Sequence, residues 1–265
     1  MRTLLRVCSA TVLLALFFSR GVGWSVGVVL SSLLTAAVLV AADDGMRATT
    51  RLEGVAILTW LYWGLSYVSN LVEALYFQVI PVLDAKRSVV AGLAIALLVA
   101  CIVVWSRPGR SREVDGRVRN AAHLWWRIPF LGLLFFVFYM AAGMAIRPWI
   151  ISFYQNRPLP SLGQLATLQF CRGLLDTACI FPLLRKWGCS RQRAAWVSAS
   201  IFVVLCGWGP LLLPNRFLPD GIRFAHGVEM GAAGIAFGIV TVWLLLKPVA
   251  AAPEKPAIDR SHFVA

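Results

Sequence analysis

The chain has 265 residues, of which 59% are hydrophobic and only 14% are charged. A water-soluble domain usually carries about 25% charged residues, and a helix that crosses a bilayer needs roughly 20 mostly apolar ones. The composition therefore excludes a soluble enzyme and supplies apolar residues for about eight membrane spans. The six cysteines have no paired spacing and mostly lie in apolar runs, which excludes a disulfide-built secreted domain.

The formal net charge of +13 does not indicate a nucleic-acid partner. The 25 basic residues form short clusters between hydrophobic segments instead of one soluble basic face. This distribution is typical of a protein whose partner is the lipid bilayer, because basic loops orient membrane helices.

Eight long apolar runs, broken by charge, predict eight transmembrane helices. They cover residues 3–18, 22–42, 54–78, 88–105, 128–146, 161–184, 194–213 and 222–246. Arg2 and Arg6, followed by the apolar residues 7–18, resemble part of a signal peptide, but no small-residue cleavage pattern follows, so we expect a retained helix. The sequence thus predicts an all-α, polytopic integral membrane bundle formed by one domain, residues 1–247. The tail, residues 248–265, has two prolines and no apolar stripe, which predicts a disordered cytoplasmic segment.

Basic residues are unequally divided between alternate loops. With the N-terminus inside, seventeen lie on the inner side and seven on the outer side. Because short basic loops stay in the cytoplasm, this asymmetry predicts that both termini are cytoplasmic and that the protein resides in the plasma (inner) membrane. Segment 106–120 is the longest predicted inner loop.

Familiar catalytic and cofactor motifs are absent from the sequence. It contains no P-loop, zinc-protease, nucleophile-elbow or dinucleotide-binding pattern, and it shows no recognisable repeat of four helices. We therefore expect no cofactor, and the sequence leaves enzymatic activity and oligomeric state open.

Polar and ionisable residues inside three of the predicted spans are the strongest functional signal. Such residues are costly in hydrocarbon, so they usually face the interior of a bundle and have partners. The candidate site residues are Asn70, Glu73, Gln169, Arg172, His226 and Glu229. Gln164 and Asp176 lie on the same helix as Arg172, and Asp176 is expected to be its local partner or to lie nearer the inner side.

The expected depths of these residues agree. A helical rise of about 1.5 Å per residue places them between about 6 Å and 16 Å from the predicted outer ends of their helices. Arg172 can therefore reach Glu73 or Glu229 in the outer half of the membrane. Glycines at 227, 231, 234 and 238 further predict close packing of the last helix against a neighbour.

Three interpretations of this polar layer remain open. It could bind or transport a small solute or ion. It could belong to an intramembrane hydrolase or transferase acting on a lipid-like substrate, with Glu73, His226 and Glu229 as the metal ligands if a metal is present. It could also only hold helices together in a structural or accessory subunit.

The predicted topology can be tested by cysteine labelling in a background that lacks the native cysteines. Cysteines introduced at Asn156 and Asp220 should react with a membrane-impermeant thiol reagent in intact cells, because both positions lie in predicted outer loops. A cysteine at Ser111, in the predicted inner loop, should react only after the cells are opened. The reverse pattern would invert the predicted orientation.

Overall fold

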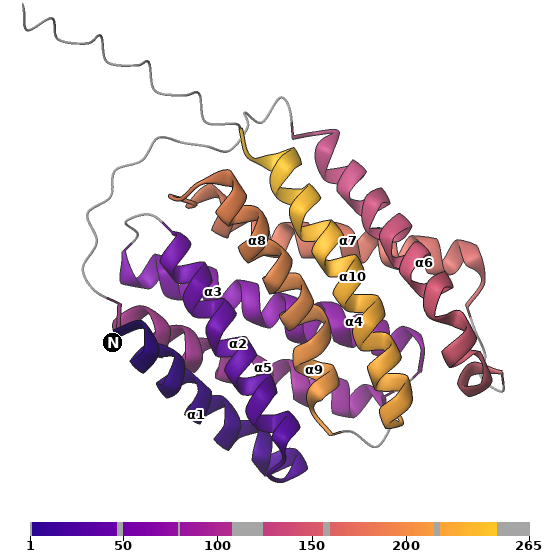
Figure 1. The fold of residues 1–265 in the computed structure, drawn as a ribbon, viewed down its shortest axis with the longest axis horizontal. Coiled ribbons are helices and arrows are strands. Elements are labelled where there is room, and N and C mark those ends of the chain that lie inside the picture. Colours follow the sequence, from indigo (N-terminus) through magenta and orange to yellow (C-terminus); the bar gives the residue numbers. More distant parts are fainter. Residues whose placement is uncertain are drawn as a thin grey trace, which may run out of the picture.

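The computed structural model describes residues 2–46, 50–78, 80–107, 124–155, 160–214 and 218–247, and every regular element in these ranges is helical (Figure 1). The elements are α1 (Arg2–Val22), α2 (Val26–Gly45), α3 (Arg51–Trp63), η1 (Gly64–Ser69), α4 (Asn70–Tyr76), α5 (Val82–Trp105), α6 (Arg127–Tyr154), α7 (Leu162–Arg185), α8 (Arg191–Ile201), η3 (Phe202–Trp208), α9 (Gly209–Leu212) and α10 (Asp220–Leu245). The predicted tail and most of the predicted inner loop lie outside these residues.

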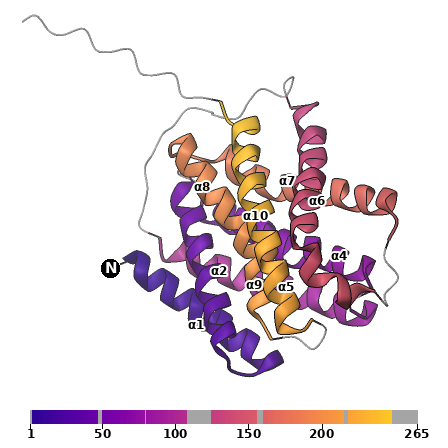
Figure 2. The same cartoon turned by 45° about the vertical axis from the view of Figure 1, so that its right-hand side comes forward.

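Seven of the eight predicted spans are confirmed as helical segments that are long and apolar enough to cross a membrane. The eighth predicted span, residues 161–184, does form a helix, α7, but its polar residues keep it out of this group. Many of its residues are buried, including Gln169, Arg172 and Asp176. In both ribbon views α7 crosses behind α10 and α6 (Figures 1 and 2). Other helices therefore shield the buried polar residues of α7 from lipid.

Two of the spans are interrupted by π-helical segments. The segment η1 separates α3 from α4, η3 separates α8 from α9, and the two segments contact each other. A π-helical turn changes the usual backbone pairing, and such turns often lie at functional sites. Here the Leu205 carbonyl in η3 accepts hydrogen bonds from the Ser66 hydroxyl at 2.9 Å and from the Asn70 amide at 3.2 Å. The two interruptions are therefore joined by polar side chains of the third span.

The structure contains a repeat of four spans that is not visible in the sequence. In each half the first span packs against the second and the fourth, and the third packs against the fourth. The second span of each half also packs against the interrupted third span of the other half. The same neighbour relations thus occur twice, once in α1–α5 and once in α6–α10.

Individual side-chain contacts follow this repeat. The Trp63 indole donates to the Val89 carbonyl at 3.0 Å, and the Trp208 indole donates to the Gly227 carbonyl at 2.8 Å. Both acceptors are the eighth residue of their helix, α5 and α10 respectively, and both helices begin after a proline cap. Because each contact fixes the third span of a half against the fourth, the halves share local packing as well as topology.

The connections after α2 and α7 meet where the halves join. Met46 and Trp187 form an antiparallel bridge, and the Gly188 amide donates to the Gly45 carbonyl at 2.9 Å. The Trp187 side chain is buried against Gly45, where a Cβ atom would lie 2.1 Å from the ring. Equivalent segments of the two halves are therefore in direct contact, as expected near a pseudo-two-fold axis.

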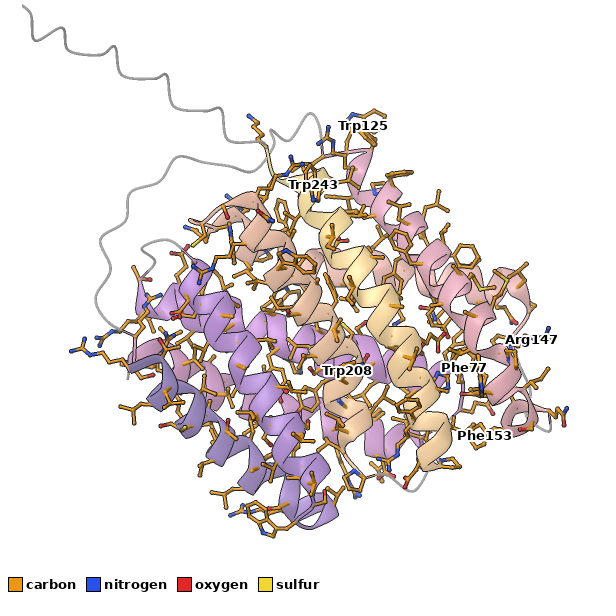
Figure 3. All side chains as sticks on the ribbon, viewed as in Figure 1. Phe77, Trp125, Arg147, Phe153, Trp208 and Trp243 are labelled. Carbon is orange, nitrogen blue, oxygen red and sulfur yellow. The ribbon has the colours of Figure 1, made fainter. Side chains whose placement is uncertain are left out.

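Aromatic side chains mark the two ends of the bundle. Figure 3 shows Trp125 and Trp243 at one end and Phe77 and Phe153 toward the other. Trp125 and Trp243 are mostly exposed, and the Arg191 guanidinium lies 4.0 Å from the centre of the Trp243 ring. Tryptophan and arginine together are typical of the interface between lipid and water.

Close packing of α10 through its glycines is confirmed. A Cβ atom at Gly238 would lie 2.5 Å from backbone atoms of Ala199, and one at Gly234 would lie 3.0 Å from the Val203 amide nitrogen. Backbone atoms cannot move aside as a flexible side chain can, so these glycines set the distance between α10 and the α8–η3 span.

Substituting Gly238 tests this packing. Gly238→Ala should destabilise the purified protein by about 1–3 kcal/mol, because the added methyl group overlaps the α8 backbone. Gly221→Ala, in the first turn of the same helix and with open space around it, should leave the midpoint of thermal unfolding unchanged or slightly higher. Equal effects of the two substitutions would contradict the close approach.

Candidate functional site

A buried guanidinium organises the first half of the polar layer. Arg172 on α7 is 1% exposed, and its Nη1 lies 2.8 Å from Oε2 of Glu73 on α4. The same nitrogen donates to Oε1 of Gln169 at 3.0 Å, and the Gln169 amide donates to Oε1 of Glu73 at 3.0 Å. Glu73 is thus held by two side chains of α7. Of the two cross-helix partners that the sequence left open for Arg172, the structure selects Glu73.

The remaining donors of Arg172 are directed at the third span. Its Nη2 lies 3.5 Å from Oδ1 of Asn70, and its Nε lies 3.4 Å from the Ser69 hydroxyl. The guanidinium carbon also lies 5.6 Å from the centre of the Phe135 ring on α6, within the range of a cation–π contact. Arg172 is therefore enclosed by acceptors and an aromatic ring, as a desolvated cation requires.

A second network joins α10 to α6. Nδ1 of His226 lies 2.7 Å from Oε2 of Glu229, and the Tyr154 hydroxyl lies 2.9 Å from Nε2 of His226. A neutral His226 donates to Glu229 and accepts from Tyr154, whereas a protonated His226 donates to both. Glu229 is 4% exposed, and its Oε1 fills the space that a side chain at Gly143 would take.

Tyr139 on α6 lies between the two networks. It interacts electrostatically with Glu73, Glu229, Arg172 and Tyr154. Tyr139 could not be singled out in the sequence, because one tyrosine among many aromatic residues carries no periodic signal. The structure thus brings all six predicted site residues into two adjacent networks and adds Tyr139, Tyr154, Ser66 and Ser69.

Two other polar residues of α7 have different positions. Gln164 completes a capping box with Ser161 at the start of the helix, so it is a helix-terminus residue and not part of the layer. Asp176, one turn beyond Arg172, is fully buried, and neither of its carboxylate oxygens has a hydrogen-bond partner. The Ser69 hydroxyl is near this carboxylate but outside hydrogen-bond geometry.

The conditional metal site formed by Glu73, His226 and Glu229 is not assembled. Over the described ranges, no three histidine, cysteine, aspartate or glutamate side chains converge as metal ligands. Glu73 is engaged by Arg172 and Gln169, and both ring nitrogens of His226 already have partners. The donor groups of the layer are therefore arranged for hydrogen bonding and ion pairing.

A further buried charge cluster lies at the other end of the bundle. Arg6 is 1% exposed, forms a close ion pair with Asp43 and donates to Asp44 at 2.6 Å and to the Val103 carbonyl at 3.1 Å. Arg107 lies 3.3 Å from Asp43. In the sequence, Arg6 and Arg107 cannot be distinguished from the other basic residues that orient the chain in the membrane. The spacing of Arg6 within an amphipathic first helix gives no indication that it is buried.

Two shallow apolar grooves lie on the described part of the chain. One is lined by residues of the α1–α2 turn around Trp24, and the other lies between α3 and α5 around Trp60. Neither is lined by a residue of the polar layer. Within the layer, the side chains of Glu73 and His226 are 21% and 19% exposed.

The chain is similar to a short part of a longer protein. A UPF0182 protein from Solibacter usitatus (strain Ellin6076) is 32% identical over 165 residues. That stretch covers 60% of this chain but 18% of the relative, so the chain spans less than a fifth of the relative's length. The relative's name specifies no ligand or reaction. No family model and no solved structure matches the chain.

The pairing of Arg172 with Glu73 predicts a specific rescue. Arg172→Met should destabilise the protein by about 3–5 kcal/mol, because it leaves the Glu73 carboxylate without its counter-charge. Arg172→Met combined with Glu73→Gln should recover part of this loss, measured as folded yield and as the midpoint of thermal unfolding in detergent. Arg172→Met combined with Glu229→Gln serves as the matched control and should show no recovery. If Glu229→Gln restored the stability of Arg172→Met and Glu73→Gln did not, the result would contradict the observed pairing.

Proposed function

We propose that the chain is a plasma-membrane protein with both termini cytoplasmic and that its polar layer, near the outer face, binds or transports a small solute or ion. The seven apolar helices support the membrane setting. The position of the layer toward the Phe77 and Phe153 end supports its assignment to one face, since Glu73 and Tyr154 are close neighbours of these residues in the chain.

The charge balance of the layer carries the proposal. Glu73 and Glu229 of the layer and the neighbouring Asp176 supply three carboxylates, whereas Arg172 is the one fixed positive charge among the described residues of the layer. A protonated His226 could balance one more carboxylate. The low dielectric of the bundle penalises the remaining negative charge, so the layer should take up protons or small cations.

The state of Arg172 argues against an anion as the ligand. Its terminal nitrogens are directed at Glu73, Gln169 and Asn70, so a bound anion would have to replace existing acceptors. An anion would also add negative charge to a site that already has an excess. The ligand best suited to the layer is therefore a small cation or a solute with a cationic group.

The hydrolase or transferase interpretation has less support. His226 is bonded to Tyr154 and Glu229, so neither ring nitrogen is free to activate a serine or cysteine nucleophile. The described residues also supply no three-ligand metal site that could activate water.

Ligand-dependent thermal stability tests the proposal. Purified protein should be heated with chloride salts of sodium, potassium, ammonium and small organic ammonium ions, at constant ionic strength set with N-methylglucamine chloride. A ligand at about 100 times its Kd should stabilise the folded state by about 2.7 kcal/mol. Glu229→Gln should abolish the effect, because it removes charge from the layer with little change in volume.

Asp84→Asn is the matched control, since Asp84 is an exposed carboxylate paired with Arg87 outside the layer. This variant should keep the response of the unchanged protein. Stabilisation by anions such as phosphate would contradict a cationic ligand. An equal response of Glu229→Gln, Asp84→Asn and the unchanged protein to every salt would instead favour a purely structural role for the layer.

A further inference from the structure

Asp176 is the most unusual charged residue in the described part of the bundle. It is fully buried, and both of its carboxylate oxygens lack hydrogen-bond partners. Other buried carboxylates are satisfied: Asp43 is bound by Arg6 and Arg107, and Glu229 by His226. A buried ionised carboxylate without a partner is strongly unfavourable, so this group is expected to carry a proton in the observed packing.

The groups that face Asp176 come from three spans. Arg172 and Cys179 lie on α7 itself, Glu73 and Ser69 belong to the interrupted third span, and Cys206 lies in η3. The side toward α6 is apolar, because Gly173 packs against Phe135 and Gly132. Arg172 is therefore the one positive charge facing Asp176 from the described residues, and it is paired with Glu73 instead.

Arg172 has two carboxylates as electrostatic neighbours, Glu73 and Asp176. Asp176 is four residues further along α7, which places it one turn away on the same helical face, within reach of the long arginine side chain. Glu73 lies 2.8 Å from Arg172 on the neighbouring span. Arg172 interacts electrostatically with both carboxylates. One guanidinium can neutralise only one unit of negative charge, so the two carboxylates compete for it.

We propose that Asp176 is a proton-binding site and that its protonation decides whether Arg172 pairs with Glu73 or with Asp176. With the proton on Asp176, Arg172 holds Glu73, as observed. When the O–H bond breaks, the proton leaves to water, and the negative charge that remains on Asp176 attracts Arg172. Glu73 then loses its counter-charge and becomes free to hold a monovalent cation.

This inference rests on the proposed function in one respect, the use of Glu73 by a cationic ligand. One proton released from Asp176 is then matched by one positive charge gained at Glu73, so the net charge of the layer is unchanged. Cation binding at Glu73 would thus be coupled to proton release from Asp176. The π-helical segments beside Ser69 and Cys206 provide the place where the local packing could adjust.

Infrared difference spectroscopy of the purified, ligand-free protein tests the proton site directly. The unchanged protein should show the carbonyl stretch of a protonated carboxyl group in an apolar environment, and this band should disappear on raising the pH. Asp176→Asn, which imitates the neutral form with the same volume, should lack the band. Asp84→Asn, an exposed carboxylate outside the site, is the matched control and should retain it.

Thermal stability provides a second readout. If the folded state holds a proton that the unfolded chain has lost, the free energy of unfolding falls as the pH rises. The unfolding midpoint of the unchanged protein should therefore decrease between mildly acidic and alkaline pH, whereas that of Asp176→Asn should vary less. A band and a pH dependence that are both unaffected by Asp176→Asn would overturn the proposal.

Glu73→Gln tests the competition for Arg172, and it does so even if Asp176→Asn fails to fold. Without its competitor, Asp176 gains Arg172 as a partner, so the protonated-carboxyl band should disappear at a pH lower by about one unit or more. If the band disappeared at the same pH in Glu73→Gln as in the unchanged protein, the switch would be overturned. Stabilisation by sodium at alkaline pH that is lost in Asp176→Asn but kept in Glu73→Gln would show a cation site at Asp176 in place of a proton site. Because the spectra need no ligand, a failure to find any ligand for the layer would count against the proposed function alone.

Discussion

The polar layer depends on the desolvation of a single guanidinium. Arg172 is buried inside a helical bundle, where every unmet hydrogen bond of a charged group is costly. Its acceptors must therefore be brought to it, and they come from two elements, the third span and α7 itself. The interruption of the third span at η1 serves this arrangement, since Ser69 and Asn70 at its end both face the arginine. The polar side chains of α7 and the burial of its central part follow from the same need to surround Arg172 with acceptors away from lipid.

The two halves of the repeat differ at this contact, because only one of them places a buried arginine there. The contact of α7 with the third span corresponds to the contact of α2 with the seventh, in the other half. There the Ser31 hydroxyl donates to the Gly209 carbonyl at 2.8 Å, and Gly27 lies against the Leu212 carbonyl. Small residues allow that contact to close tightly. The equivalent position around Arg172 is polar, so the two halves differ at this contact.

The sequence predicted the parts of this structure that follow from hydropathy and from the cost of polar groups in lipid. All eight apolar runs form helices, and the six polar residues chosen for their rarity in such runs lie in two hydrogen-bonded networks. The π-helical segments were not predictable, because hydropathy does not distinguish a π-helical turn from an α-helical one, and the contact between η1 and η3 joins residues that are distant in the chain. The four-span repeat was hidden for a related reason: Trp63 and Trp208 play the same part, but the residues around them differ.

The second buried cluster gives the strongest internal comparison for the function of the first. Around Arg6, two arginines face two aspartates, and each aspartate has a partner. Such a balanced cluster can be satisfied permanently and suits a structural role between α1, α2 and the end of α5. Around Arg172, one arginine faces Glu73 and Asp176, and Asp176 is left without a partner. If buried charge served only to hold helices together, both clusters should be balanced. The imbalance occurs only in the cluster that lies beside two interrupted helices, which is where a site that exchanges charge with its surroundings would need to be.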